Sequence, residues 1–120
     1  MKEHQFRRLT VWVRSMTFVT TIYKLTSTFP KAEQHGLISQ IRRAAISIPL
    51  NIAEGSGSGS NTEFIRFLSI AKRSAYEVIT GFEIAKNLQY GDQKEIDLCI
   101  IEVQEISAMI VGLVQSLKKH

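Results

Sequence analysis

The sequence of 120 residues has few of the side chains that most often build catalytic or metal centres. It contains one cysteine, Cys99, and three histidines that lie far apart. A single cysteine excludes an intrachain disulfide framework and a cysteine-rich zinc site. A di-iron bundle needs Glu-x-x-His on two helices, and Glu33 and His35 have the wrong spacing for it. We therefore expect a protein that binds no cofactor and is not an enzyme.

Proline and long apolar runs are also scarce. The chain has two prolines, and no apolar run reaches the ~20 residues that a membrane span needs. The first eight residues, MKEHQFRR, lack the apolar region of a signal peptide. We expect a cytoplasmic protein without membrane contact, folded as one domain over residues 1–120.

The charge is moderately positive, with a formal net charge of +4. An excess of this size permits binding to nucleic acid or to an acidic partner. It is equally compatible with charge that only keeps the protein soluble. The total charge alone therefore leaves the partner open.

Apolar residues recur in steps of three and four through four segments, which keeps one face of an α-helix on a core. We predict helices at about residues 7–28, 32–54, 61–89 and 92–118. The predicted core positions are Leu9, Trp12, Met16, Val19, Tyr23 and Thr26 in the first helix, Leu37, Ile41, Ala44 or Ala45, Ile48 and Ile52 in the second, Phe64, Phe67, Leu68, Ala71, Ala75, Val78, Phe82 and Ala85 in the third, and Ile96, Cys99, Val103, Ile106, Ile110, Leu113 and Leu117 in the fourth.

The connections between these segments carry helix-capping residues. Ser60 and Glu63 have the spacing of a capping box, and Asp92 is placed to cap the fourth helix. Gly55 and Gly91 are the expected carboxyl-terminal caps of the second and third helices. Because short connections make neighbouring helices antiparallel, we predict an all-α, up-down-up-down four-helix bundle.

Several helices carry a second apolar row, such as Ile101 and Val111 in the fourth and Ile84 in the third. A small bundle on its own should not expose so many apolar side chains. The second rows indicate either a wide core face or an interface between subunits.

Residues 47–64, SIPLNIAEGSGSGSNTEF, raise the question of a dedicated site. The run of glycine and serine lacks the preceding strand and the Gly-Lys-Ser/Thr ending of a phosphate-binding loop. Pro49 should bend or locally open the second helix. Polar side chains share one face of this helix, and they form either a surface for a partner, ligand or pore, or a hydrogen-bond network between helices. The residues of interest in this segment and just before it are Arg43, Ser47, Pro49, Asn51, Glu54 and Gly55.

The predicted topology gathers positive charge at the end that holds both termini and the Gly-Ser connection. We take these residues as a candidate nucleic-acid contact through backbone phosphates, with ordinary solubilising charge as the alternative. The candidate residues are Arg7, Arg8, Arg14, Arg66, Lys118 and Lys119.

Three stretches resemble one known family: FRRLTVW at residues 6–12, GLISQIRRAAISIPLNIAEGSGSGS at 36–60 and EFIRFLSIAKRSAYEVITGFEIAKNL at 63–88. They are similar to the four-helix bundle proteins encoded in intervening sequences of bacterial large-subunit ribosomal RNA genes. SIPxNIAEG is the most specific motif. Members often carry a basic residue where this chain has Ser58. Any phosphate contact that this basic residue makes in other members is therefore missing here.

The resemblance implies a bundle that assembles as a homopentameric ring. It also implies a relation to the accessory variability protein of diversity-generating retroelements, which binds a reverse transcriptase and nucleic acid. We therefore expect an oligomeric, non-enzymatic protein that binds RNA or DNA weakly or assists a nucleic-acid enzyme. The alternative is a protein–protein assembly or adaptor module without a nucleic-acid role.

Overall fold

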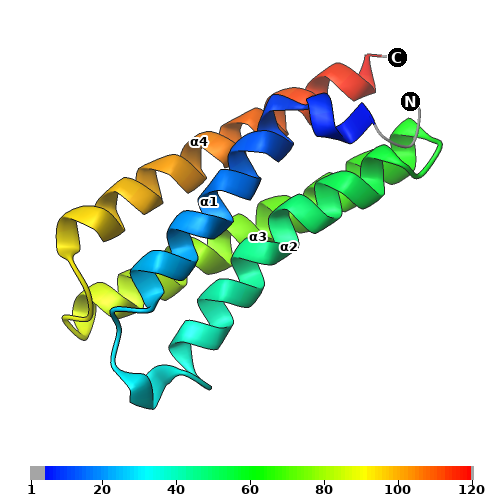
Figure 1. The fold of residues 1–120 in the computed structure, drawn as a ribbon. Coiled ribbons are helices and arrows are strands. Elements are labelled where there is room, and N and C mark those ends of the chain that lie inside the picture. The colour runs from blue at the N-terminus through cyan, green and yellow to red at the C-terminus, as the bar shows by residue number, and fades with distance from the viewer. Residues whose placement is uncertain (1–4, 120) are drawn as a thin grey trace.

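The computed structural model describes residues 5–119, which form four α-helices joined by short connections (Figure 1). The helices are α1 (Thr10–Thr26), α2 (Leu37–Ser56), α3 (Asn61–Asn87) and α4 (Gln93–Lys118). Two short 3-10 helices, η1 (Gln5–Arg8) and η2 (Lys31–Glu33), precede α1 and α2. The described residues contain no strand, so the all-helical prediction is confirmed.

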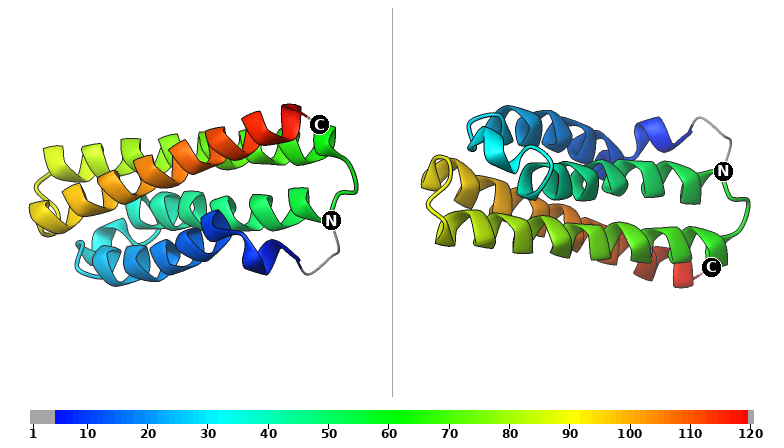
Figure 2. Two further views of the ribbon diagram at one scale, coloured as in Figure 1. Left: turned by 90° about the horizontal axis from the view of Figure 1, so that it is seen from above. Right: turned by 90° about the horizontal axis from the view of Figure 1, so that it is seen from below.

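The helices form an elongated antiparallel bundle of 46 × 20 × 20 Å (Figure 2). Each helix packs against two others, in the order α1, α2, α3, α4 and back to α1. The connection at 57–60 lies at the same end as η1 and the last turn of α4, and we call this the terminal end. The connections at 27–36 and 88–92 lie at the opposite end, which we call the closed end.

The core runs along the bundle axis and confirms most of the predicted positions in α2, α3 and α4. Full burial of an aliphatic or aromatic side chain contributes roughly 1.5–3 kcal/mol. The core helices therefore owe most of their stability to packing rather than to intrinsic helix propensity. The most deeply buried of the predicted positions are Ile41, Ile48 and Ile52 in α2, Leu68, Ala71, Ala75, Val78, Phe82 and Ala85 in α3, and Ile96, Val103, Ile106 and Ile110 in α4.

The predicted core face of α1 was only partly right. Thr26 is buried, and Leu9, Trp12 and Val19 pack against the core. Met16 and Tyr23 are exposed, whereas Phe18 and Ile22 are buried. The true face includes Ser15, whose hydroxyl donates to the Trp12 carbonyl at 2.8 Å and so is satisfied inside the bundle. Because the polar residue Ser15 lies within the buried face of α1, a search for apolar spacing alone does not detect that face. Apolar side chains on both sides of α1 then gave a second series with helical spacing.

Small residues let α2 and α3 approach each other closely. A Cβ atom at Gly81 would lie 2.6 Å from Cγ1 of Ile41, and one at Gly55 would lie 2.8 Å from Cδ1 of Phe64. No real side chain fits at these distances without movement of its neighbour. Gly55 is therefore needed for packing in the last turn of α2, and the prediction that it caps the helix was wrong, since Gly57 holds that position.

Two of the predicted caps are confirmed and one is corrected. The Ser60 hydroxyl accepts from the Glu63 N–H at 3.1 Å, and the Asp92 carboxylate accepts from the Lys94 N–H at 2.8 Å. At the end of α3, however, Gln89 rather than Gly91 takes the left-handed cap position, with φ of 61°.

The hydrogen bonds of that cap show its type. The Gln89 N–H donates to the Lys86 carbonyl at 3.0 Å, and the Tyr90 N–H donates to the Ala85 carbonyl at 2.9 Å. These two bonds are the pattern of a Schellman motif, which satisfies the last carbonyls of a helix. The α3 helix therefore ends at Asn87, four residues before Gly91.

The helix limits also differ at the starts of α1 and α2. The first helix begins at Thr10 rather than at residue 7, after the 3-10 turn of η1. The second begins at Leu37 rather than at residue 32, because η2 and a short turn come first. Pro49 lies inside α2, and the helix continues past it to Ser56.

Candidate functional site

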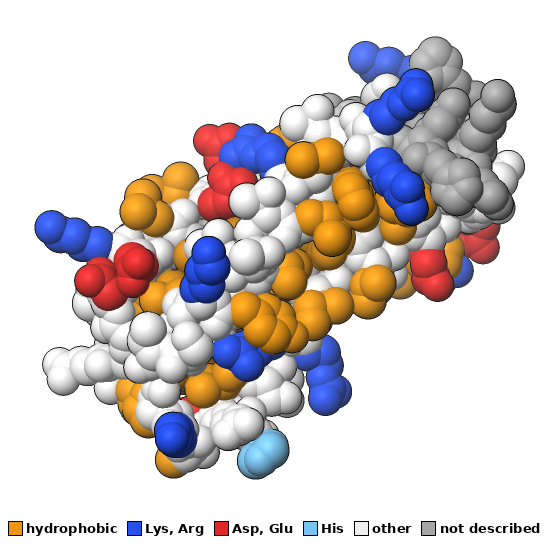
Figure 3. Space-filling view, viewed as in Figure 1, with side chains coloured by type: hydrophobic (Ala, Val, Ile, Leu, Met, Phe, Trp, Pro, Cys, Tyr) orange, Lys and Arg blue, Asp and Glu red, His pale blue; other side chains and the backbone are white. Residues whose placement is uncertain are grey.

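The terminal end brings together five of the six predicted basic residues from three separate elements. Arg7 and Arg8 lie in η1, Arg66 lies in the second turn of α3, and Lys118 and Lys119 follow one another at the end of α4. All five side chains are exposed. Figure 3 shows Lys and Arg side chains at this end and also along the rest of the face that it presents.

The 3-10 turn of η1 is held against the bundle by aromatic packing. The Phe6 and Trp12 rings meet edge to face, with centroids 5.2 Å apart. The Leu9 N–H donates to the Phe6 carbonyl at 3.0 Å. The Arg7 guanidinium lies 6.0 Å from the centroid of the Phe6 ring. These contacts place two adjacent arginines on the flank of the bundle instead of on a free chain end.

A hydrogen bond joins the start of α3 to the end of α4. The Asn61 side-chain amide donates to the Leu117 carbonyl at 3.2 Å. Next to it, the Ser58 hydroxyl donates to the Gly55 carbonyl at 2.6 Å, which orders the Gly-Ser connection. The lysines that follow Leu117 therefore lie beside the 57–60 connection.

Arg66 is not a free cation. Its Nε donates to the Glu63 carboxylate at 2.6 Å, and its guanidinium lies 4.5 Å from the centroid of the Phe67 ring. The Glu63 carboxylate therefore contacts Arg66, whereas the capping-box prediction had it turned back to the helix start. An exposed pair of this kind contributes little to stability, but it lowers the positive charge that Arg66 offers to a partner.

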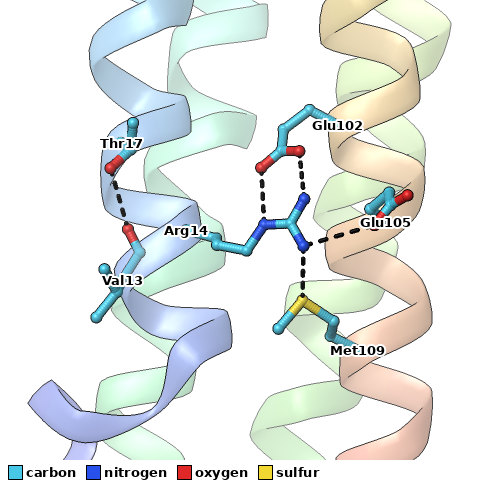
Figure 4. A network of polar contacts seen from close by, with 6 residues as sticks. All are labelled: Val13, Arg14, Thr17, Glu102, Glu105 and Met109. Atoms are coloured by element: carbon cyan, nitrogen blue, oxygen red, sulfur yellow. Dashed lines mark hydrogen bonds and ion pairs between the residues drawn. The ribbon is translucent and has the colours of Figure 1, made fainter.

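Arg14 does not belong to this basic surface (Figure 4). It lies in the second turn of α1, where its Nε donates to Glu102 at 3.1 Å and a second nitrogen pairs with the other oxygen of the same carboxylate. Glu105 lies 3.5 Å from Nη1. The bonds to Glu102, followed by the charges of both carboxylates, raise the pKa of Arg14. The sequence interpretation missed this pairing because the partners are 88 residues apart.

The two ends of the bundle differ in charge. The closed end has near balance, with Lys24, Lys31, Lys86 and Lys94 against Glu33, Glu83, Asp92, Glu95 and Asp97. The terminal end has an excess of cations within the described residues, with Arg7, Arg8, Arg66, Lys118 and Lys119 against Glu54 and Glu63. The structure therefore brings five cations and two carboxylates together at one end.

The polar residues of α2 form a hydrogen-bond network with α3. The Asn51 amide donates to the Ser47 hydroxyl at 2.9 Å and to the Ser47 carbonyl at 2.8 Å. The Ser74 hydroxyl of α3 lies 2.8 Å from the same Ser47 hydroxyl. These polar side chains on one face of α2 therefore join α2 to α3. Pro49, between these two α2 residues in the sequence, is buried.

Arg43 and Glu54 remain outside that network. Both side chains are exposed, and neither takes part in an ion pair within the part of the chain that the structure describes. Arg43 therefore pairs with neither Glu54 nor Glu77. Arg43 instead lines a groove with a volume of 550 Å³ on the outer side of α2.

The sequence interpretation also missed the role of Arg42, which fixes the edge of this groove. Its Nε donates to the Thr26 hydroxyl at 2.9 Å, and Nη2 donates to the Tyr23 carbonyl at 3.1 Å. The guanidinium stacks over the Tyr23 ring, 4.3 Å from its centroid. The sequence shows that Arg42 and Arg43 are adjacent basic residues. No local pattern in the sequence shows that Arg42 contacts residues of α1.

The one cysteine is a core residue, as predicted. Cys99 is 3% exposed, and burial, followed by the charges of Glu95 and Glu102, raises the pKa of its thiol to about 11. A thiol with so high a pKa is a poor nucleophile at neutral pH. Residues 5–119 contain no group of three or more His, Cys, Asp or Glu side chains that could hold a metal ion, and His4 and His120 lie outside this range.

None of the described helices is both long enough and apolar enough to cross a membrane. A comparison with curated proteins finds no match for the chain.

The family comparison and one solved structure agree with each other. The family model described as 23S rRNA-intervening sequence protein matches residues 7–112. A crystal structure from Bacteroides thetaiotaomicron, described as a protein of unknown function from the S23 ribosomal protein family, has 26% sequence identity and a TM-score of 0.80. The similarity covers 88% of this chain and 98% of that one. With most of the chain matched by the family model, and with the same bundle in the solved structure, this chain belongs to the 23S rRNA-intervening sequence protein family.

Proposed function

We propose that this chain forms a non-enzymatic, oligomeric helical bundle that binds nucleic acid weakly, mainly through backbone phosphates. The observation that carries this proposal is the terminal end, where three elements each place exposed cations at the same end of the bundle. Arg7, Arg8, Lys118 and Lys119 make no ion pair with any described residue, so their charge is available to a partner.

The chemistry of this surface suits phosphate rather than base recognition. Lysine and arginine on an open convex end can neutralise backbone phosphates, and binding then releases condensed counterions. Affinity of this kind falls steeply with salt and depends little on sequence. A protein with such a surface can act as an accessory to a nucleic-acid enzyme by holding the template or product near it.

Assembly would strengthen this binding. The expected state is a homopentameric ring, which would bring the terminal ends of five parallel subunits onto one face. Several binding surfaces on one particle raise the apparent affinity without any new contact. Exposed apolar side chains support an interface between subunits, since Leu98 is 65% exposed and Ile101 is 55% exposed.

Fluorescence anisotropy tests the nucleic-acid role. A labelled duplex DNA and a labelled structured RNA are titrated with protein at low and near-physiological salt. We expect binding that weakens with salt, and a variant with Arg7, Arg8, Lys118 and Lys119 changed to serine should bind more weakly with a shallower salt dependence.

A matched variant controls for the loss of net charge. Lys24, Lys31, Arg73 and Lys94 are exposed and make no ion pair with the described residues, and changing all four to serine removes the same charge elsewhere. The control variant should retain most of the affinity. Equal losses in both variants, or no binding at low salt, would contradict the proposed surface.

The exposed apolar residues favour a second candidate, a protein–protein assembly module without a nucleic-acid role. Analytical ultracentrifugation of the wild type and of a Leu98→Glu/Ile101→Glu variant tests the interface. We expect a wild-type particle with five times the mass of one chain, and a smaller particle for the variant. A monomeric wild type would remove both the ring and the shared basic face.

A further inference from the structure

We propose that the groove on the outer side of α2 holds an unpaired nucleotide of a single-stranded nucleic acid, with Tyr23 and Arg42 against the base and Arg43 against a phosphate. This inference rests on the proposed nucleic-acid function and adds a base-dependent site to it. The groove is separate from the terminal end, since it lies beside the second half of α1 and extends along α2 from residue 38 to residue 51.

The sign of the charge in the groove selects an anion. Its 550 Å³ are lined by Arg42, Arg43 and His35, and none of the described residues that line it is Asp or Glu. Because Arg43 makes no ion pair with a described residue, its five N–H donors are available to a phosphate.

The second property is a flat, fixed surface at the edge of the groove. Two hydrogen bonds to α1 and the stack on Tyr23, at 4.3 Å, hold the Arg42 guanidinium in one orientation. Guanidinium planes and tyrosine rings are both surfaces on which nucleic-acid bases stack. Since the side chain is already ordered, stacking on it requires little further loss of side-chain entropy.

The third property is an apolar lining next to these charges. Ile38, Ile46 and Leu50 line the same groove, and Leu50 is 60% exposed. Figure 3 shows apolar side chains running along the face where α1 and α2 meet, with basic side chains beside them. A ligand that combines flat apolar faces with a phosphate fits this lining better than a bare anion does.

A single strand meets these requirements and a duplex does not. In a duplex the bases are stacked and paired, so only phosphates and groove edges reach a convex protein surface. In a single strand the bases turn outward and stack on side chains, and each base stacked on an aromatic residue typically strengthens binding at least about fivefold.

The test compares three labelled DNA 12-mers with the same number of phosphates per strand: a single strand, an abasic single strand and a duplex. Binding of each to the intact protein is followed by anisotropy at low salt. We expect the wild type to bind the normal single strand roughly five- to tenfold more tightly than the abasic strand.

Two variants show which residues cause the preference for the normal single strand over the abasic strand. Tyr23→Leu/Arg43→Gln should remove it while leaving duplex binding unchanged. Tyr76→Leu/Arg73→Gln is the matched control on α3, because Tyr76 and Arg73 are exposed and lie outside the groove. The control should keep the preference. Photo-crosslinking of a strand that carries 5-iodouracil should label the peptide that contains Tyr23.

The outcomes separate this inference from the proposed function. Duplex binding without a preference for bases would overturn the nucleotide groove and leave the phosphate surface intact. Absence of all binding would overturn both. A crosslink only at another aromatic residue, or equal loss in the control variant, would also overturn the groove. A smaller particle for Tyr23→Leu/Arg43→Gln in ultracentrifugation would show that the groove contacts a second copy of the chain, and would overturn it as well.

Discussion

The two ends of the bundle differ in the balance of their charged side chains and in the hydrogen bonds that these side chains make. At the closed end, Lys86 contacts Asp97 at 2.8 Å and Glu83 at 3.7 Å, and the Tyr90 hydroxyl donates to Glu33 at 3.0 Å. At the terminal end, four cations make no ion pair with any described residue. Lys24, Lys31 and Lys94 at the closed end also make no ion pair with a described residue, but there the carboxylates balance the cations, whereas at the terminal end the cations are in excess.

The closed end is also packed more tightly. Phe29 is 4% exposed and meets the Tyr90 ring at a centroid distance of 5.9 Å. Glu33 accepts from the Leu37 N–H at 3.1 Å as well as from Tyr90, so one carboxylate joins both connections at this end. At the terminal end, the space around the Cα of Gly59 is open. The two connections of the closed end are therefore tied to each other, whereas the 57–60 connection has open space at Gly59.

The largest expected effect is the loss of Phe29. Phe29→Ala should lower the free energy of unfolding by about 3 kcal/mol, because it removes a buried ring and leaves a cavity. Phe6→Ala at the terminal end should cost only about 1 kcal/mol, the usual value of an edge-to-face aromatic pair. Urea unfolding followed by circular dichroism measures both. Equal losses would show that the two ends are packed alike.

A second comparison uses two glycines with similar backbone angles. Gly91 and Gly59 have φ of 68° and 87°, and alanine at either position is strained by about 1–2 kcal/mol. At Gly91 the added Cβ would also lie 2.6 Å from Cε1 of Phe29. Gly91→Ala should therefore cost about 1–3 kcal/mol more than Gly59→Ala, as overpacking does. Thermal and urea unfolding of the two variants should show this difference, and its absence would mean that Phe29 moves aside freely.

The pH dependence of stability should reveal the contact between Tyr90 and Glu33. The hydrogen bond to Glu33, followed by burial and the carboxylate charge, raises the pKa of Tyr90 above its usual value near 10. A raised pKa gives stability that is fully present below the unfolded pKa and is lost as the pH rises through the folded pKa. The wild type should be more stable than Tyr90→Phe at pH 8, and the gap should narrow above about pH 10.

Urea midpoints at several pH values check this prediction. Tyr23 and Tyr76 are present in both proteins, so the comparison isolates Tyr90. A gap that stays constant up to pH 11 would show that the hydroxyl contributes through packing rather than through its bond to the carboxylate.

The smallest effect is expected for the cations of the terminal end. Changing Arg7, Arg8, Lys118 and Lys119 to serine should alter the free energy of unfolding by no more than about 0.5 kcal/mol, as for ordinary surface substitutions. Lys86→Ser at the closed end should lower stability, since it removes contacts that raise the pKa of Lys86, first among them the bond to Asp97. A stability loss in the fourfold variant would mean that those charges are structural.

Local patterns identified most of the fold. The apolar spacing of α4 predicted its buried side, and Ser60 and Asp92 marked helix starts, because periodicity and capping involve residues within a few positions of each other. The same kind of pattern was only partly right on α1, where Ser15 interrupts the buried row and the predicted core residue Met16 is exposed. It also failed at Gly91, since backbone geometry at a helix end can select Gln89 instead.

The sequence by itself determined the number of helices, their order and the concentration of cations near one end. These depend on side-chain type and on neighbours one helical turn away. Only the tertiary structure decided which of those cations remain free. Arg14 and Glu102 are 88 residues apart, and Arg42 meets its acceptors 16 and 19 residues away on another helix. Such partners are set by how whole helices pack, and the free energy of that packing is spread over the entire core.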